Sequence, residues 1–349
     1  MIKSLRITIL RLLAISLGIL LLMGALGCSK ESDKIELKLA HFFPGTHPAE
    51  TRLVTQYKEA ISKATNGKVI ITSYPGETLL KAPDIYDGVV KNVADMGLSC
   101  FAYTRGRFPV LEAFELPGIV YKNSKVASKV AWEGIKELNP KEIQDTKLMM
   151  VLATGPGDLF TKKPVATLAD LKGLEVRATG ISAKTLKLLG AIPVGMAQSE
   201  AYEALSKGIV QGNLSPVEVL KGWRHAEVTS HLTITPFLYN TLFFITMNLE
   251  KWNALPADIK DAITKVNESF HQEVAIGLWD SQNEPALEWA TKEKGMKVIA
   301  LSPEETAKWI ELVKPIQKDF VTEMAKKEIN GQEVLDKINA LAQKYDTEY

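Results

Sequence analysis

Segments with strand periodicity and segments with helix periodicity alternate along the first third of the chain. Residues 35–39 alternate apolar and polar side chains with a period of two, as a half-buried strand does. Residues 48–64 then carry apolar side chains at helical spacing, and Asn66 and Gly67 follow as a typical helix ending. This alternation predicts an α/β fold with a parallel-rich sheet covered by helices. The next expected elements are a strand over residues 69–73, a helix over 84–92 and a strand over 96–99.

The same alternation returns in the middle of the chain, without any sequence repeat. Thr167 and Asp170 fit a capping box at the start of a short helix, which Gly173 ends. The chain is therefore expected to contain a second region of similar architecture. Its elements are a strand, a helix, a strand and a helix over residues 174–178, 182–189, 191–194 and 199–207.

A long run of helical spacing follows the second region. A helix over residues 256–294 would be about 57 Å long if Pro285 only kinked it. Such a helix would join two lobes, and the alternative is two successive helices broken at Pro285. The apolar positions at steps of three and four are Ile259, Ile263, Val266, Phe270 and Val274.

The C-terminal region is also predicted to be helical. Ser302, Pro303 and Glu305 mark a helix start, with Trp309 and Leu312 expected on the buried side. This helical region is expected to pack on the exterior of a lobe.

The N-terminus resembles a bacterial export signal. Residues 12–27 are apolar or small and stand behind Lys3, Arg6 and Arg11, and Cys28 follows them. These features predict cleavage before Cys28, lipid modification of that cysteine and a polar tether over residues 28–34. The alternatives are ordinary signal cleavage nearby and an uncleaved anchor, although sixteen residues make only about 24 Å of helix.

Removal of this signal changes the composition that matters for folding. Loss of 27 residues, three of them basic, leaves 322 residues and shifts the formal charge from +1 to −2. This charge excludes a large electrostatic footprint for nucleic acid, and the length favours two lobes. Cys100 is the only other cysteine, so no disulfide forms if Cys28 is acylated, and its apolar surroundings predict a packed thiol.

Signatures of enzymes and metal sites are absent from the sequence. There is no Gly-x-Gly-x-x-Gly string, phosphate loop, Gly-x-Ser-x-Gly or His-Glu-x-x-His. His41 and His47 lie six residues apart in an expected loop, which is a poor metal set without further ligands. No cofactor and no metal are therefore expected, whereas the absence of these motifs does not by itself exclude an enzyme.

Ordered strings along the whole exported chain resemble one protein family. The N-terminal strings are Leu-Ala-His at 39–41, Thr-Asn-Gly-Lys-Val at 65–69, Tyr-Pro-Gly-Glu-Thr-Leu-Leu at 74–80 and Phe-Glu-Leu-Pro-Gly at 114–118. The later ones are Asp-Leu-Lys-Gly-Leu-Glu-Val-Arg at 170–177, Glu-Ala-Tyr-Glu-Ala-Leu-Ser-Lys-Gly at 200–208 and Asn-Leu-Glu-Lys-Trp-Asn-Ala-Leu-Pro at 248–256. Their order and spacing resemble the solute-binding proteins of tripartite ATP-independent periplasmic (TRAP) transporters, dicarboxylate type.

This resemblance implies a two-lobed α/β clamp like other periplasmic binding proteins, with a long inter-lobe helix. We expect one lobe to comprise residues 35–153 plus 246–284 and the other residues 154–245 plus 285–349. The family binds a solute in its cleft, catalyses no reaction and delivers the solute to membrane permease subunits. A monomer is expected on the periplasmic or extracytoplasmic side, without a nucleic-acid partner.

The resemblance also implies one binding residue. In the family, an arginine on the strand after the Asp-Leu-Lys-Gly string pairs with the solute carboxylate, and Arg177 holds that position. A guanidinium fits a carboxylate bidentately and stays charged, which suits this role. The alternative is that Arg177 pairs with a structural Asp or Glu.

Two departures from the family pattern bear on the solute. Many members have a second cleft arginine shortly after the glycine at position 155, where this chain offers Asp158. The family's Asp-Gly-Gln-Glu string is replaced by Gln-Gly-Asn-Leu at 211–214, which includes Asn213. A small diacid would lack one charge partner, so a single carboxylate with an uncharged or cationic remainder is expected. Asp158 would then bind an ammonium or hydroxyl group, or would instead cap a turn.

Aromatic side chains near strand ends indicate an aromatic or apolar monocarboxylate, or an amino or keto acid. One alternative is an exported enzyme on the same clamp, with its acid and base among Glu77, Asp158 and His41. Another is a ligand-binding partner of a membrane sensor. His225, His231 and His271 are assigned to the surface or to packing. The candidate binding residues are Arg177, Asp158, Phe42, His41, Tyr74, Glu77, Phe101, Asn213, Trp223 and Tyr239.

Overall fold

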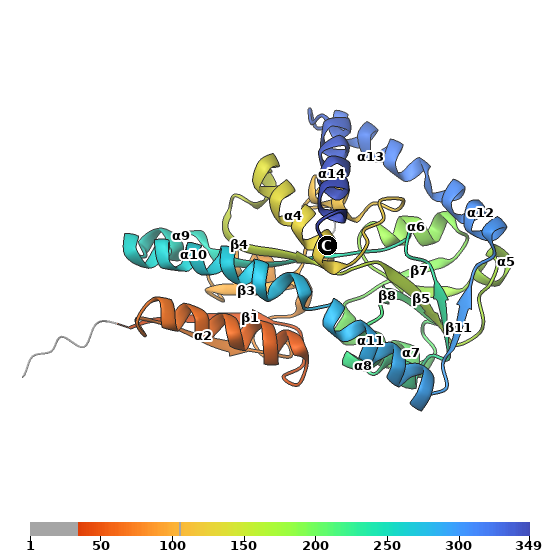
Figure 1. Ribbon diagram of the computed structural model, residues 1–349, viewed down its shortest axis with the longest axis horizontal. Coiled ribbons are helices and arrows are strands. Elements are labelled where there is room, and N and C mark those ends of the chain that lie inside the picture. Colours follow the sequence, from red (N-terminus) through yellow and green to blue (C-terminus); the bar gives the residue numbers. More distant parts are fainter. Residues whose placement is uncertain (1–33, 105) are drawn as a thin grey trace, which may run out of the picture.

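Two sheets form the two halves of the molecule in the computed structural model (Figure 1). The structure describes residues 34–104 and 106–349, so the expected export segment and Cys28 lie outside the described residues. Sheet A contains, in spatial order, β2 (Val69–Tyr74), β1 (Ile35–His41), β3 (Met96–Cys100), β10 (Leu242–Asn248) and β4 (Thr146–Ala153). Sheet B contains β11 (Lys297–Ala300), β9 (His231–Ile234), β5 (Gly157–Thr161), β8 (Gly212–Pro216), β6 (Glu175–Ala178) and β7 (Ile192–Gly195).

Helices cover both sheets and complete a two-lobed α/β clamp, as predicted. The strands predicted from the alternation run parallel, because β1 pairs with β2 and β3, and β6 pairs with β7. Strand β8, which was not predicted, also runs parallel to β6. The α-helices are α2 (Thr55–Ala64), α3 (Ile85–Val90), α4 (Ser124–Leu138), α5 (Leu168–Leu171), α6 (Ser182–Leu188), α7 (Gln198–Lys207), α8 (Val219–Gly222), α9 (Leu249–Ala254), α10 (Ala257–Glu273), α11 (Asp280–Glu288), α12 (Pro303–Val313), α13 (Pro315–Ala325) and α14 (Gly331–Asp346).

The chain crosses between the sheets at neighbouring points. Strand β4 of sheet A leads into β5 of sheet B, and β9 of sheet B leads back into β10 of sheet A. The two connections are bonded to each other, because Thr154 N–H donates to the Thr241 carbonyl oxygen at 3.0 Å and Thr241 N–H donates to Thr154 Oγ1 at 3.0 Å. These bonds hold the two connections together as one paired crossing between the lobes, and a third connection runs from β10 through α9, α10 and α11 to β11.

The predicted long helix is wrong as one continuous element. It divides into α10 and α11 at Val274, whose backbone (φ −123°, ψ −54°) is not helical, and a short 3₁₀ turn, Ala275–Gly277, follows. Pro285 lies inside α11 and is not the break. The start of α4 contacts this turn, because Ser124 Oγ donates to the Ile276 carbonyl oxygen at 3.0 Å.

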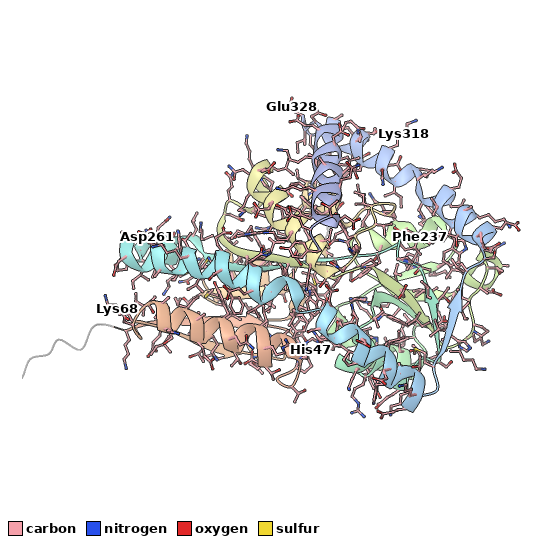
Figure 2. All side chains as sticks on the ribbon, in the orientation of Figure 1. His47, Lys68, Phe237, Asp261, Lys318 and Glu328 are labelled. Carbon is pink, nitrogen blue, oxygen red and sulfur yellow. The ribbon has the colours of Figure 1, made fainter. Side chains whose placement is uncertain are left out.

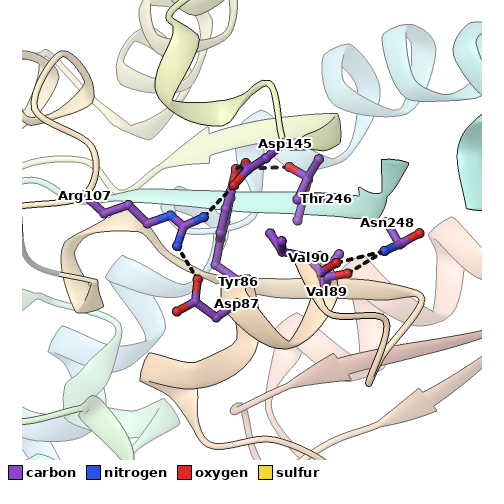
Figure 3. Close-up of polar contacts among 9 residues, drawn as sticks. Tyr86, Asp87, Val89, Val90, Arg107, Asp145, Thr246 and Asn248 are labelled. Carbon is purple, nitrogen blue, oxygen red and sulfur yellow. Dashed lines mark hydrogen bonds and ion pairs between the residues drawn. The ribbon is translucent and has the colours of Figure 1, made fainter. Parts of the chain in front are cut away.

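Helix α3 is tied to two strands of sheet A, β10 at its end and the start of β4 near its beginning (Figure 3). Asn248 Nδ2 donates to the carbonyl oxygens of Val89 and Val90 at 2.9 and 3.2 Å. Near the start of the same helix, Tyr86 Oη donates to Asp145 Oδ1 at 2.7 Å, and Arg107 pairs with Asp145 and with Asp87. Asn248 thus joins β10 to the end of α3, whereas the bonds to Asp145 join the start of α3 to the residue before β4.

The C-terminal helices connect the two halves (Figure 1). Helix α12 contacts α6 beside sheet B, whereas α14 packs on α4, which covers β4 of sheet A. Ser302 caps α12 and Trp309 is buried, as predicted, but Leu312 is 41% exposed, so its expected burial is wrong. The expected lobe boundary at residues 245–246 also falls inside β10, and α14 packs on the first lobe although residues 285–349 were assigned to the second.

Within residues 34–104 and 106–349, no helix combines the length and the apolar character needed to cross a membrane.

Candidate functional site

Arg177 lies on β6 with its side chain almost fully buried, at 2% exposure. Its Nε donates to the Met196 carbonyl oxygen at 3.1 Å, and Nη1 donates to Ser215 Oγ at 3.2 Å. Nη1 also reaches Asn213 Oδ1 at 3.5 Å. In the described part of the chain, none of these bonds goes to a carboxylate. The structure therefore does not pair Arg177 with a structural acid, because its charge is buried without a carboxylate in hydrogen-bond contact.

The partners of Arg177 belong to a buried polar network on sheet B. Asn213 pairs with Arg177 in the parallel register of β6 and β8, and Asn213 Oδ1 also accepts from Ser215 Oγ at 2.9 Å. The Asn213 amino group lies 3.0 Å from His225 Nδ1, and the Gln198 amide lies 3.1 Å from His225 Nε2. The network holds the guanidinium in one orientation.

His225 contributes no charge to this network. Burial, and then the charge of Arg177, lower the pKa of His225 to about 3, so its ring is neutral. Because Asn213 Oδ1 already accepts hydrogen bonds from Arg177 and Ser215, the Asn213 amino group donates to Nδ1 of the imidazole. Of the two roles expected for His225, the surface role is wrong, because the residue is fully buried and packs within this network.

Aromatic rings from both lobes share a cavity wall with Arg177. Phe42 and Phe43 follow β1 and stack on each other at 4.2 Å between centroids. Trp223, just after α8, stacks on Phe42 at 5.9 Å, and Tyr103 meets Phe42 edge-on at 5.4 Å. Trp223 Nε1 is buried and has no acceptor among the described residues. The rings thus form an apolar wall with one unused donor.

A small cavity lies between these groups. Its volume is about 20 Å³, which is room for one or two water molecules. An open groove of about 680 Å³ shares Tyr103 and Thr179 with it and has Lys184 and Lys187 on its wall. The geometry is that of a closed clamp with a vestibule. The cavity wall includes Phe42, Phe43, Tyr103 and Phe243 from the first lobe, Arg177, Gln198, Glu218 and Trp223 from the second, and Thr154, Tyr239 and Thr241 from the crossing.

Gly157 makes room for one of these rings. A Cβ at Gly157 would lie 2.4 Å from Tyr239 Cδ1 and 2.9 Å from the Ser215 carbonyl oxygen. Gly157 N–H also donates to the Tyr239 carbonyl oxygen at 2.8 Å. Tyr239 is thereby fixed against β5 at the cavity wall.

Cys100 is buried at the end of β3, as predicted. Burial is the main reason that the pKa of its thiol lies well above the usual range. The thiol therefore stays protonated and packs in the cavity wall without reactivity.

Asp158 does not line the cavity. Its Oδ1 accepts the Thr235 N–H at 2.7 Å, which is the contact of a backbone cap. Burial raises the pKa of the Asp158 carboxyl to about 6, although the bond from Thr235 acts in the opposite direction. Of the two expected roles, the observed contact is the structural one.

His41 and Glu77 make structural contacts elsewhere. His41 Nε2 lies 2.7 Å from Glu50 Oε2, and Glu77 Oε1 accepts the Ala82 N–H at 2.8 Å. Neither residue lines the cavity, and neither meets Asp158 in a hydrogen bond. The arrangement expected of an exported enzyme, with an acid and a base among these three residues, is not formed by their contacts.

Tyr74 and Phe101 also lie outside the cavity wall. Phe101 packs in the core against Phe108 and Phe244, with centroids 4.9 Å from each. Arg177, Phe42, Trp223 and Tyr239 line the cavity, and Asn213 contacts Arg177 behind it. Binding by all ten candidate residues stays a prediction.

Sequence reasoning missed four polar residues around Arg177. Gln198 begins α7, Ser215 lies on β8, and Glu218 precedes α8, so each comes from a different element of the second lobe. His225 completes the set. Local sequence gave no signal for them, because strand register and helix positions bring them together.

Comparisons with known proteins agree with this geometry. The profile of the bacterial extracellular solute-binding proteins, family 7 (DctP), matches residues 39–324. The C4-dicarboxylate-binding periplasmic protein DctP of Rhodobacter capsulatus is 26% identical over 320 residues, covering 89% of this chain and 93% of that protein.

Two solved structures are similar over about nine-tenths of this chain. A TRAP periplasmic solute-binding protein from Desulfovibrio salexigens, in an open complex, is 35% identical with a TM-score of 0.77 and coverage of 89% and 97%. A marine metagenome TRAP protein specific for aromatic acid ligands, in complex with metahydroxyphenylacetate, is 29% identical with a TM-score of 0.84 and coverage of 90% and 100%. This chain belongs to family 7 of the bacterial extracellular solute-binding proteins and is a TRAP-type member.

Proposed function

We propose that this protein binds the single carboxylate of an aromatic or apolar small acid at Arg177 and delivers the acid to a TRAP-type membrane permease. The buried guanidinium carries the proposal, because within the described residues it has no carboxylate partner. A solute carboxylate would offset the cost of burying that charge through a bidentate pair. The unused Trp223 N–H could donate to the same anion.

The cavity wall supports a monoacid. Arg177 is the only Lys or Arg side chain that the described residues contribute to this wall, so a second carboxylate would have no cationic partner. The surrounding rings favour an aromatic or apolar body. The aromatic-acid specificity of the similar marine protein is consistent with this class of solute.

Calorimetry of the exported portion tests the proposal. 3-Hydroxyphenylacetate and L-phenylalanine are titrated as monoacids, with succinate as the diacid. At least one monoacid should bind more tightly than succinate, and Arg177→Ala should weaken that binding by about 3–5 kcal/mol, more than 100-fold. Arg52→Ala, which removes an exposed guanidinium bonded to Ser281, is the matched control. Equal affinity in wild type and Arg177→Ala would overturn the proposal.

We propose further that the protein is exported and anchored through an acyl group on Cys28, as a monomer. The apolar block before Cys28 supports this anchoring. Incorporation of labelled palmitate into wild type, and its loss in Cys28→Ser, is the expected result. Equal labelling of both proteins would contradict it.

A further inference from the structure

We infer that Glu218 is a second specificity-determining residue of the cavity, and that the solute carries an ammonium or hydroxyl donor besides its carboxylate. The inference rests on the proposed function, because it needs a carboxylate at Arg177. The sequence predicted Asp158 as the acid that binds this donor, but Glu218, not Asp158, lies on the cavity wall.

Glu218 is a buried acid that shares the cavity wall with Arg177 and is 3% exposed. Its Oε2 lies 3.2 Å from His47 Nε2, so the contact joins the second lobe to the loop after β1 in the first. His47 is labelled in Figure 2. Within the described residues, Oε1 makes no hydrogen bond to a protein donor. One oxygen of the carboxylate is therefore available to a solute.

His47 orients Glu218 without neutralising it. His47 Nδ1 accepts the Ala49 N–H at 3.0 Å, so the ring proton resides on Nε2 and is donated to Glu218. A ring with this tautomer is uncharged, which leaves the carboxylate without a cationic partner in its contacts.

Gly222 allows this pair to form. A Cβ at position 222 would lie 2.8 Å from both Glu218 Oε2 and His47 Nε2. Any larger residue would therefore displace the imidazole or the carboxylate. The absence of a side chain at Gly222 therefore lets the end of α8 lie directly against the His47–Glu218 pair.

The charges of the wall select the solute. A monoacid without a donor would satisfy Arg177 but would leave Glu218 desolvated and unpaired. A second carboxylate would face Glu218 and be repelled. An ammonium or a hydroxyl group would donate to Oε1, and a zwitterion would match both charges of the wall.

Calorimetry with matched acids tests the inference. L-Phenylalanine and L-3-phenyllactate are compared with 3-phenylpropionate, and 3-hydroxyphenylacetate with phenylacetate, since each pair differs only in the donor. At least one donor-bearing acid should bind about 10-fold more tightly than its partner. The comparison of L-phenylalanine with L-3-phenyllactate shows whether the preferred donor is an ammonium or a hydroxyl group. Equal binding within both series would overturn the inference alone, whereas no binding of any acid would overturn the proposed function as well.

Variants locate the preference at Glu218. Glu218→Gln should reduce the preference for the donor to below about threefold while the dependence on Arg177 remains. Gly222→Ala, which displaces Glu218 or His47 without removing a charge, should also reduce the preference for the donor-bearing acid. Glu203→Gln removes an exposed acid of α7 and should leave it unchanged. A full preference retained in Glu218→Gln would overturn the inference. If Glu218→Gln fails to fold, the wild-type comparison still decides.

Discussion

The indole N–H of Trp223 is a buried donor without an acceptor in the described residues, at the wall of a cavity that also contains Arg177. Trp223→Phe would keep a stacking ring but remove this donor. We predict that it weakens binding of the acid that binds wild type best by roughly 1–2 kcal/mol, about 5- to 30-fold. Unchanged affinity in calorimetry would show that the solute does not accept this bond.

Individual residues were predictable to different degrees. Arg177 was identified because a family string marks its position, and Phe42, Trp223 and Tyr239 because they follow strands and motifs. Asp158 was near the expected place in sequence, but its side chain caps Thr235. Glu218 was not identified, because its partner His47 is 171 residues away in sequence.

At the scale of elements, period and capping signals predicted β1, β2, β3, β6 and β7 and the helices between them, but they did not identify β4, β5, β8, β9 or β11. The Thr167 capping box is formed as expected. The division of the long helix was not predictable, because helical spacing continues through Val274 while contacts with α4 determine the break. Asp280 Oδ1 accepts the Ser124 N–H at 2.9 Å and thereby fixes α11 against the start of α4.

Glu115 makes the inter-lobe connection sensitive to pH. Its carboxylate accepts the Leu242 N–H at 2.6 Å and the Thr241 hydroxyl at 2.8 Å. Burial raises the pKa of Glu115 to about 7, although these two bonds act to lower it. The folded state therefore holds a proton between about pH 4.5 and 7 that the unfolded state has released, so this contribution to stability is lost as pH rises through 7.

We predict that Glu115→Gln removes this dependence. At pH 8 the free energy of unfolding of Glu115→Gln should be higher than that of wild type, and at pH 5 the two should differ less. Between about pH 5 and 7 the difference should grow by on the order of 1 kcal/mol per pH unit. Denaturant titrations followed by tryptophan fluorescence at both pH values measure the difference. Glu203→Gln is the control, and the same pH difference in wild type and Glu115→Gln would contradict the prediction.

The whole molecule is a closed clamp whose cavity is smaller than the proposed solute. About 20 Å³ cannot hold an aromatic acid, so the lobes must separate at the paired crossing to admit one. The lobes are bonded across the cleft by His47 with Glu218, and by the Gln198 N–H, which donates to Tyr103 Oη at 3.0 Å.

We predict that the wild-type protein is more open in solution without solute than with it. The radius of gyration from small-angle X-ray scattering should fall when a bound acid is added. Tyr103→Phe removes the acceptor of the Gln198 N–H, and it should weaken binding by roughly 1 kcal/mol, about fivefold. Identical scattering with and without solute would contradict hinge closure.

Fold class was predictable as a whole, because alternating elements and ordered family strings extend along the chain. The lobe boundaries were less predictable than the fold class, since β10 lies in sheet A from Leu242 and α14 packs on α4 of the first lobe. Such long-range packing leaves no local pattern.

The central claim is that Arg177 binds the carboxylate of the solute. Native mass spectrometry of wild type and Arg177→Ala, each incubated with the same equimolar set of aromatic monoacids, tests it most directly. We predict one acid bound per wild-type chain and none bound to Arg177→Ala. The same adduct at the same occupancy in both proteins would contradict the claim.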